Sequence, residues 1–259
     1  MTESIRPLRV VVLVSVGRHP VSGVSRWSRN DARALSLAFS LPPSLTSIEV
    51  IHAGNAQHAA LADYLALGVK ALNVVSVAPD INIVPALLAR ARHADLIICG
   101  SRAEGQEDSG MVPYLLANAL DTSLVPSVLG LTIAQDHAVA EQFLPKGRRR
   151  SIEVGLPTVV TVHPLAPLTV RYAYAQKQAG RIIAAPAQAP AIAGTDWTVE
   201  AIRAKPIKLA AREKRSGHSR MLSATTTESR AGQVMSQGST QEKAAAVITY
   251  LREHGLIDY

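Results

Sequence analysis

The sequence predicts an α/β protein: a doubly wound, mostly parallel sheet with helices on both faces, followed by a C-terminal extended arm that ends in a helix. Two observations predict this architecture. Apolar, β-branched runs alternate with helical patterns through the first part of the chain, and a β-α-β-α order favours parallel strands joined by right-handed crossovers. After about residue 165 the composition becomes Ala/Pro-rich and then basic and polar. We therefore expect an α/β domain over residues 1–185 and an arm with a terminal helix over residues 186–259.

The expected strands are short apolar runs bounded by polar residues or glycine. The first, RVVVLVSV at residues 9–16, is apolar almost throughout, which is typical of a parallel strand buried on both faces. Gly54 follows the second run and Gly100 follows the fourth, so both runs end at a residue that favours a turn. Strands are expected at residues 9–16, 47–53, 71–77, 95–99, 123–132, 138–144 and 156–162.

The expected helices lie between these strands. Residues 28–40 place apolar side chains at helical spacing, and Ser28, Asn30 or Asp31 can supply the N-cap. Further helices are expected over residues 56–67, from Pro85 to about His93, and over residues 111–121.

The last part of the chain has a different character. Residues 184–195 are Ala/Pro-rich and predict an extended linker. Residues 203–240 are basic and then Ser/Thr/Gly-rich, which is typical of an arm that orders on a partner or stays disordered. Beyond the candidate N-caps Ser239 and Thr240, apolar residues repeat at helical spacing. A terminal helix with such a stripe must pack on its own domain or on another chain.

The net charge of +7 is concentrated in two basic clusters, at residues 146–150 and 203–220. Such clusters bind nucleic acid, anionic membranes or acidic proteins, or are simply solvated. Only 4% of residues are aromatic, so stacking surfaces are scarce and no nucleic-acid partner is expected. No apolar stretch of about 18 residues exists, so no direct membrane insertion is expected. The single cysteine, Cys99, excludes an intrachain disulfide and fits a reduced, cytoplasmic setting.

Three segments are expected to meet beyond the carboxyl ends of the strands, where parallel sheets bind their ligands. These are residues 15–19, 53–57 and 100–110. In the third segment a strand, a glycine-containing loop and a helix start follow one another. Backbone N–H groups and the helix dipole at such a start favour a phosphate.

The loop at residues 100–110 has two interpretations. Serines and glycines can approach a phosphate closely and an arginine adds positive charge, whereas three acidic side chains in the same loop disfavour a triphosphate. A monophosphate held by amides and hydroxyls is compatible with both sets; an acidic surface loop without a ligand is the alternative. The residues that favour binding are Gly100, Ser101, Arg102, Ser109 and Gly110, and those that oppose it are Glu104, Glu107 and Asp108.

The chain has no recognisable catalytic or metal-binding signature. The P-loop pattern and a GxGxxG after the first strand are absent, as are CxxC, HExxH and GxSxG. An SGGxDS-type pyrophosphate loop, which a hydrolase or ligase of adenylated substrates needs, is also absent. These absences favour binding over bond-making, so we do not expect an enzyme.

Five stretches of the chain, taken in this order and spacing, match the pattern of a known family. They are RVVVLVSVGRHP, VIHAGNAQHAALADYLALGV, DLIICGSRAEGQEDSGMVPYLLANAL, LPTVVTVHPLAPLTVRYAYA and QEKAAAVITYLREHGLI. Together they resemble the β subunits of electron transfer flavoproteins. The resemblance covers most of the chain, is most specific at residues 100–120 and 156–173, and is patchy between residues 165 and 235.

The resemblance implies a partner and two cofactors. A β subunit of this family pairs with an α subunit that holds most of one FAD, covers one side of that flavin, and itself buries an AMP. Electrons arrive from flavin-containing dehydrogenases and leave toward a membrane quinone oxidoreductase. By this likeness the arm and terminal helix at residues 186–259 pack on the α subunit.

The resemblance also implies site residues. Asn30 falls near the position of an aromatic residue that lies against the flavin, and Arg171, Tyr172 and Ala173 match the start of the dehydrogenase recognition loop. The cofactor-binding residues are expected to be Ser15, Ser28, Asn30, Asp31, Ala53, Gly100, Ser101, Arg102, Ala103, Asp108, Ser109 and Gly110.

Three departures from the family pattern point to a divergent bacterial branch, similar to those that serve the catabolism of methylated amines such as dimethylglycine. SRND stands at residues 28–31 in place of Asn-Pro-aromatic, KGRRR at residues 146–150 replaces an acidic-glycine segment, and Ala175 replaces a leucine. The alternative function is a stand-alone adenine-nucleotide-binding protein of the universal-stress type, which shares the same sheet and phosphate-binding logic.

Overall fold

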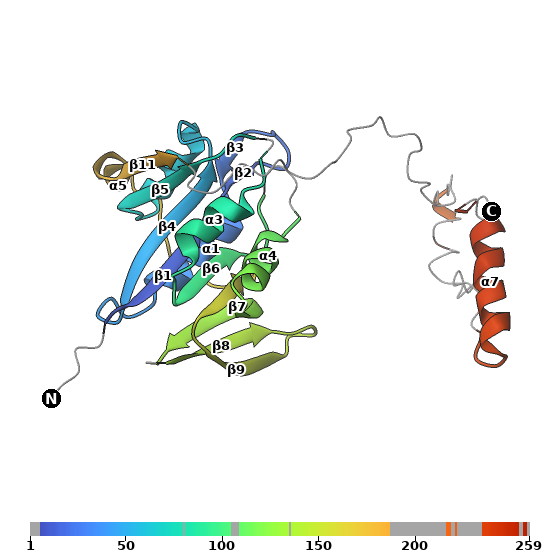
Figure 1. Ribbon diagram of the computed structural model, residues 1–259. Helices are drawn as coiled ribbons and strands as arrows, with labels where there is room; N and C mark the ends of the chain where they lie inside the picture. Colours follow the sequence, from blue (N-terminus) through green and yellow to red (C-terminus); the bar gives the residue numbers. More distant parts are fainter. Residues whose placement is uncertain are drawn as a thin grey trace. The chain divides into compact units, whose positions relative to one another are not determined.

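The computed structural model describes residues 6–79, 81–104, 109–134, 136–186, 216–218, 221, 235–253 and 256–257. The chain divides into two units, residues 1–197 and residues 198–259. The first unit is an α/β domain built on a nine-stranded sheet, and the second carries the terminal helix (Figure 1).

The large sheet is mostly parallel, as predicted. Its strand order is β11-β5-β4-β1-β6-β10-β7-β8-β9; neighbouring pairs are parallel from β11 to β7 and antiparallel from β7 to β9. β2 and β3 form a separate antiparallel hairpin. The strands are β1 Leu8–Leu13, β2 Val16–Arg18, β3 Ser25–Trp27, β4 Thr46–Gly54, β5 Ala71–Ser76, β6 Leu96–Gly100, β7 Ser123–Ile133, β8 His137–Phe143, β9 Arg149–Gly155, β10 Thr158–Val162 and β11 Arg181–Pro186.

Helices cover both faces of this sheet. Alternate residues of β1 separate the two cores: Val10 and Val12 belong to one, whereas Val11 and Leu13 belong to the other. The first core includes side chains of α1 and α2, and the second includes side chains of α3 and α4, which lie over the sheet in Figure 1. The helical segments are α1 Arg29–Phe39, η1 Ala59–Leu61, α2 Ala62–Ala66, α3 Val84–Ala91, α4 Val112–Ala119, α5 Tyr174–Ala179 and α7 Thr240–Glu253.

Helix α1 begins where its capping residue predicts. Ser28 has extended backbone geometry, and its side-chain oxygen accepts a hydrogen bond from Asp31 N. This bond satisfies one of the amides that the first turn of a helix leaves without an intrahelical partner. The cap therefore fixes the start of α1, which is the side of the helix that borders the candidate site.

The structure corrects two expectations in the first half of the domain. The run at residues 9–16 is two strands, because β1 ends at Leu13 and Val16 starts the β2–β3 hairpin. The helix expected over residues 56–67 is a 3₁₀ turn followed by the short helix α2. The helical segment begins only after its N-cap His58, whose side-chain Nδ1 accepts from Ala60 N.

Three elements of the second half were not expected from the sequence. Strand β9 is basic and exposed along much of its length, and only Ile152 and Val154 pack toward the core, so its apolar pattern is weak. Helix α5 and strand β11 occupy residues 174–186, and β11 runs into the stretch interpreted as an extended linker, residues 184–195. The remainder of that stretch, and the basic segment up to residue 215, lie outside the described residues.

The terminal helix α7, taken by itself, agrees with its expected start. Ser239 Oγ accepts from Glu242 N at 3.3 Å, and Glu242 Oε2 accepts from Ser239 N at 2.7 Å. This reciprocal pair is a capping box. Val247 and Ile248 are exposed on α7, which leaves apolar surface on this helix. Among the described residues, no helix has the length and apolar character that a membrane crossing requires.

Candidate functional site

The candidate site lies at the carboxyl edge of the sheet, where the connections from β1 and β6 diverge. The chain leaves β1 for β4 on one side, and later enters β6 on the other side of β1. Doubly wound sheets bind ligands at such a switch point. Ser15 follows β1 and Gly100 ends β6, so this edge is the one that the sequence indicated.

A buried hydrogen-bond network occupies the space between these strand ends. Asp31 Oδ2 accepts from Ser15 N at 2.8 Å and from Ser15 Oγ at 2.6 Å. The Tyr64 hydroxyl donates to Ser15 O at 2.6 Å, accepts from Ser28 N at 2.9 Å, and lies 3.3 Å from Asp31 Oδ2. Tyr64 is fully buried. One phenol therefore joins the end of β1, the start of α1 and the helix α2.

Burial is the dominant influence on the carboxyl group of this network. It raises the pKa of Asp31 from 3.8 to about 6, although hydrogen bonds from Ser15, Ser28 and Tyr64 act to lower that pKa. The same desolvation raises the pKa of the Tyr64 phenol well above its usual value. Burial therefore keeps the Asp31 carboxyl protonated to a higher pH than an exposed aspartate.

Gly100 allows α1 and β6 to approach each other closely. A Cβ atom at this position would collide with Asp31 Oδ1 and come within 2.9 Å of Asn30 Cβ. Asn30 is buried, and its Nδ2 donates to Arg102 O at 3.1 Å. The start of α1 and the loop after β6 are therefore packed directly against each other.

Glu104 ties this loop to the β2–β3 hairpin and to α1. Its Oε1 accepts from Arg29 N at 2.9 Å, its Oε2 pairs with Arg26 Nη2 at 3.1 Å, and its carbonyl accepts from Arg18 N at 2.9 Å. The carboxylate lies where the dipole of α1 favours negative charge. Arg26 Nε is buried and has no hydrogen-bond partner among the described residues. Glu104, which opposed phosphate binding in the sequence interpretation, is engaged by its own chain.

The loop reaches α4 through a glycine with left-handed backbone geometry. Gly110 has φ 68°, and a Cβ there would lie 2.9 Å from Ser101 O, so only glycine fits without strain. Ser109 Oγ accepts from Met111 N at 3.4 Å just before α4. Asp108 lies outside the described residues.

Only some of the residues predicted to bind a cofactor contact one another in the structure. Ser15, Ser28, Asn30, Asp31 and Gly100 form the contacts described above. Ala53 lies half-buried near the end of β4 and packs on the second core. Around the loop, Ser101, Ala103 and Gly110 are half-buried, whereas Arg102 and Ser109 are exposed.

The predicted recognition residues lie elsewhere, on the segment between β10 and α5. The Tyr172 hydroxyl donates to Asp63 Oδ1 at 3.1 Å, and Ala173 N donates to Ala66 O at 2.9 Å. Lys177 Nζ also pairs with Asp63 Oδ1, at 2.9 Å. Arg171 is exposed and borders an open groove of about 780 Å³.

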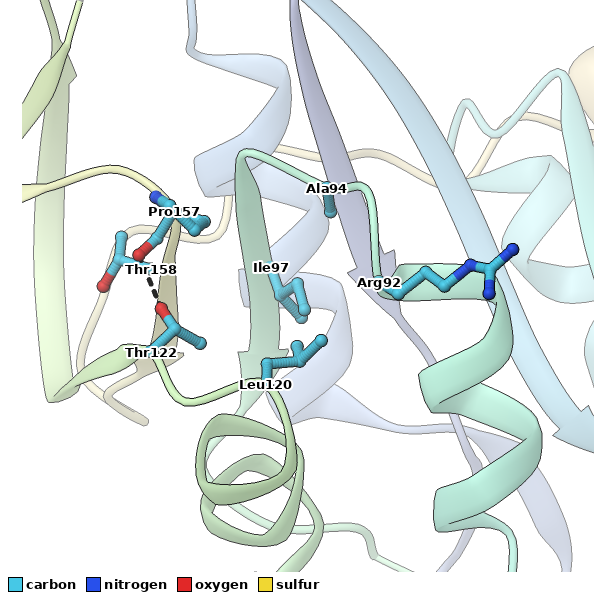
Figure 2. Close-up of a pocket in the computed structure, with 7 residues that line it drawn as sticks. All are labelled: Arg92, Ala94, Ile97, Leu120, Thr122, Pro157 and Thr158. Atoms are coloured by element: carbon cyan, nitrogen blue, oxygen red, sulfur yellow. Dashed lines mark hydrogen bonds between the residues drawn. The ribbon is translucent and has the colours of Figure 1, made fainter.

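A second cavity lies at the opposite, amino-terminal end of the sheet (Figure 2). Its volume is about 50 Å³, room for very little beyond water, so it is no candidate for a nucleotide. Thr122 Oγ1 donates to Pro157 O across it. The residues around it are Arg92, Ala94, Ile97, Leu120, Thr122, Pro157 and Thr158.

The other side chains that could be reactive, His52 and Cys99, have the surroundings of structural core residues. His52 is buried at the end of β4 with Nδ1 2.9 Å from Val14 O, and burial lowers its pKa. Cys99 is buried, and burial raises the pKa of its thiol far above the usual range. No group of three or more metal-ligating side chains occurs in the part of the chain that the structure describes.

Sequence reasoning missed Tyr64, Arg26 and Asp63. Tyr64 lies in an alanine- and leucine-rich stretch and has the spacing of a core residue, so only the fold reveals what its hydroxyl contacts. Arg26 and Asp63 belong to segments with no motif, and their partners are 78 and 114 residues away.

Two comparisons with known proteins point to one family. The family described as "Electron transfer flavoprotein domain" matches residues 22–193. The "Electron transfer flavoprotein subunit beta" of Chromohalobacter salexigens is 33% identical in an alignment of 261 positions, gaps included, that covers 96% of each chain. A solved structure, the C-terminal domain of the coenzyme A biosynthesis bifunctional protein CoaBC, aligns with 58% of this chain and with 89% of its own chain at 11% identity. Its TM-score of 0.20 is too low to indicate a shared fold.

Proposed function

The chain belongs to the electron transfer flavoprotein family, and we propose that it serves as the β subunit of a heterodimer, binds AMP and helps to enclose an FAD held mainly by an α subunit. Membership of this family bears out the expectation of an electron carrier rather than an enzyme. The fine details, namely both cofactors, the electron donors and the acceptor, belong to the proposal.

The observation that carries the AMP proposal is the construction of the carboxyl edge between β1 and β6. Gly110 bends the chain into α4 with a geometry that side chains disfavour, and it holds Ser101 and Ser109 near the helix start. Hydroxyls and amides at such a start suit a monophosphate. The nearby Glu104 carboxylate pairs with Arg26 and accepts a hydrogen bond from the Arg29 amide of α1. Its negative charge is therefore balanced within the chain and repels a bound phosphate less.

The residues that would hold AMP divide into two sets. Ser101, Ser109 and Gly110 would hold the phosphate, whereas Ser15, Ser28 and Ala53 would border the adenosine. These border residues lie at the ends of β1 and β4 and at the start of α1, three elements that meet at this edge.

The flavin would supply the redox chemistry, because it accepts electrons and passes them on. The contribution of this chain would be to cover and position it. The tip of the β2–β3 hairpin exposes Val21 and Val24, and the hairpin leads directly into the start of α1, so it offers apolar surface next to the nucleotide edge. Asn30 is committed to Arg102 O, and its predicted contact with the flavin stays a prediction.

The partners of the proposed complex are those that the family likeness implies. The α subunit would bind this face and the arm beyond residue 186. A flavin-containing dehydrogenase would dock at Arg171, Tyr172 and Ala173, and a membrane quinone oxidoreductase would accept the electrons. The exposed side chains of Arg171 and Tyr172 are compatible with docking.

Co-expression with an electron transfer flavoprotein α subunit tests this proposal. We expect a heterodimer with the visible absorption of a bound flavin, and AMP among the molecules released on denaturation. The matched variants Gly110→Val and Gly147→Val both place a side chain at positive φ, but only the first should lower the AMP content. A colourless, unassociated chain would contradict the proposal, and a homodimer that retains ATP without flavin would indicate the stand-alone nucleotide binder.

A further inference from the structure

The short helix α2 contacts the nucleotide edge through Tyr64. The hydroxyl of this side chain binds Ser15 O, at the end of β1, and Ser28 N, at the cap of α1. Both partners are backbone groups, so the bonds fix the course of the chain rather than a single side chain. Because Tyr64 is fully buried, loss of this hydroxyl would leave Ser28 N and Ser15 O without a partner in a place that water reaches poorly.

The same helix holds the segment that follows β10. Asp63, the residue before Tyr64, binds the Tyr172 hydroxyl and the Lys177 ammonium group. Ala66 O, one turn later, accepts from Ala173 N at 2.9 Å. These bonds anchor the segment on α2 at several points.

Close packing adds to these hydrogen bonds. A Cβ atom on Gly180 would lie 2.9 Å from Leu65 Cβ, so the end of α5 is pressed against α2. The segment then enters β11, which pairs in register with β5. Movement of α2 relative to the sheet would therefore displace residues 172–180 as well.

We propose that α2 couples the nucleotide edge to residues 171–177: Tyr64 positions the site, Asp63 positions the recognition segment, and occupancy of the site by AMP holds that segment in its docking conformation. This inference rests on the proposed function, and it assigns to the nucleotide a role in preparing the surface that meets the dehydrogenase.

Coupling of this kind is reciprocal. If AMP stabilises the anchored form of the segment, AMP binds that form more tightly, so changes that release the segment weaken AMP binding. Couplings between sites in proteins are about 5- to 150-fold. The Ala173 amide is a direct reporter, because its hydrogen-bond acceptor is a carbonyl of α2.

Hydrogen exchange of the purified heterodimer, with AMP bound and after its removal, tests the coupling. We expect exchange at residues 172–177 to be at least about 5-fold faster without AMP. Exchange in β8 and β9, which are not in contact with α2, should be unchanged. Tyr64→Phe keeps the ring but removes the hydroxyl that bonds Ser15 O and Ser28 N, so the effect of AMP on exchange at residues 172–177 should largely disappear.

Reciprocity gives the second arm of the test. Asp63→Ala should weaken AMP binding by at least about 5-fold, and Tyr172→Phe should weaken it in the same direction. Tyr174→Phe is the matched control, because the Tyr174 hydroxyl accepts from Gln178 within the same helix, α5, rather than bonding to Asp63 as the Tyr172 hydroxyl does. It should leave the AMP affinity of the heterodimer as it is.

Two failures can be distinguished. Wild-type heterodimer that binds no AMP would contradict the nucleotide part of the proposed function. Heterodimer that binds AMP but shows the same exchange at residues 172–177 with and without it, and an unchanged affinity in Asp63→Ala, would overturn the coupling alone.

Discussion

The carboxyl edge between β1 and β6 and the β8–β9 hairpin both concentrate polar residues, but they differ in burial. At the edge, Ser28, Asp31 and Tyr64 are buried and bind one another or the backbone. On the hairpin, Arg149 pairs with Glu141 across the strands, and both side chains are largely exposed. Buried polar groups are costly unless they are fully hydrogen-bonded, whereas exposed pairs cost and contribute little.

The edge is therefore a buried hydrogen-bond network, whereas the hairpin is a solvated surface. The basic run at residues 146–150 is the more conspicuous feature of the sequence, yet Arg149 and Arg150 lie on the edge strand β9, where charges discourage pairing with other sheets. The edge near Asp31 is inconspicuous in sequence but forms a closed network. We therefore expect substitutions at the edge to have large effects and those on the hairpin small ones.

The largest expected effect concerns the pH dependence that Asp31 contributes. Burial raises its pKa from 3.8 to about 6, so the folded chain binds the proton more tightly than the unfolded chain does. The contribution of this group to stability is therefore fully present below pH 4 and is lost as the pH rises toward 6. The loss amounts to about 3 kcal/mol at one pKa unit per 1.36 kcal/mol.

Denaturant unfolding of the wild type and of Asp31→Asn at pH 4 and pH 7 measures this contribution. Between these pH values, the stability of the wild type relative to the variant should fall by about 2.5 kcal/mol, because part of the total is already lost at pH 4. Parallel pH profiles for the two proteins would show that the Asp31 carboxyl is solvated rather than buried.

A pair of glycines gives the next largest contrast. Gly100→Ala places a methyl group against Asp31 Oδ1 and Asn30, and overpacking of this kind destabilises by about 1–3 kcal/mol. Gly155→Ala, at the end of β9, meets no atom within 4 Å, so the change should stay within about 0.5 kcal/mol. Thermal unfolding of both variants makes the comparison, and equal losses would mean that the edge is not closely packed.

The smallest effect is expected on the hairpin itself. Glu141→Gln removes the ion pair with Arg149, and exposed pairs contribute about 0.2–1 kcal/mol. The loss should vanish in about 1 M salt, where charges are screened within about 3 Å. A loss that persists at high salt would show that this pair is shielded from solvent.

The central strands were predictable because burial on both faces leaves a plain signal. β1, β4, β5, β6 and β10 are rich in apolar, mostly β-branched residues, and the structure places a strand at each of these runs with shifted ends. β9 and β11 expose many of their side chains, so their sequences lack that signal. Their pairing depends on neighbours that are distant in sequence or on a hairpin with a basic turn.

The place of the candidate site in the fold was predictable from one general rule, but its full set of residues was not. Ligand sites follow the carboxyl ends of parallel strands, and this rule together with the family likeness indicated Ser15, Asp31 and Gly100. Tyr64 could not be found in this way, because its hydroxyl contacts residues 36 and 49 positions away. The role of Glu104 was also hidden, because the sequence shows its charge but not the arginine that binds it.

The position of AMP in a crystal of the heterodimer tests the central claim most directly. The account predicts electron density for its phosphate within hydrogen-bond distance of the amides at residues 109–111, with the adenosine toward Ser15 and Ser28. A flavin-loaded heterodimer whose AMP lies elsewhere, or that holds no AMP at saturating concentration, would contradict it.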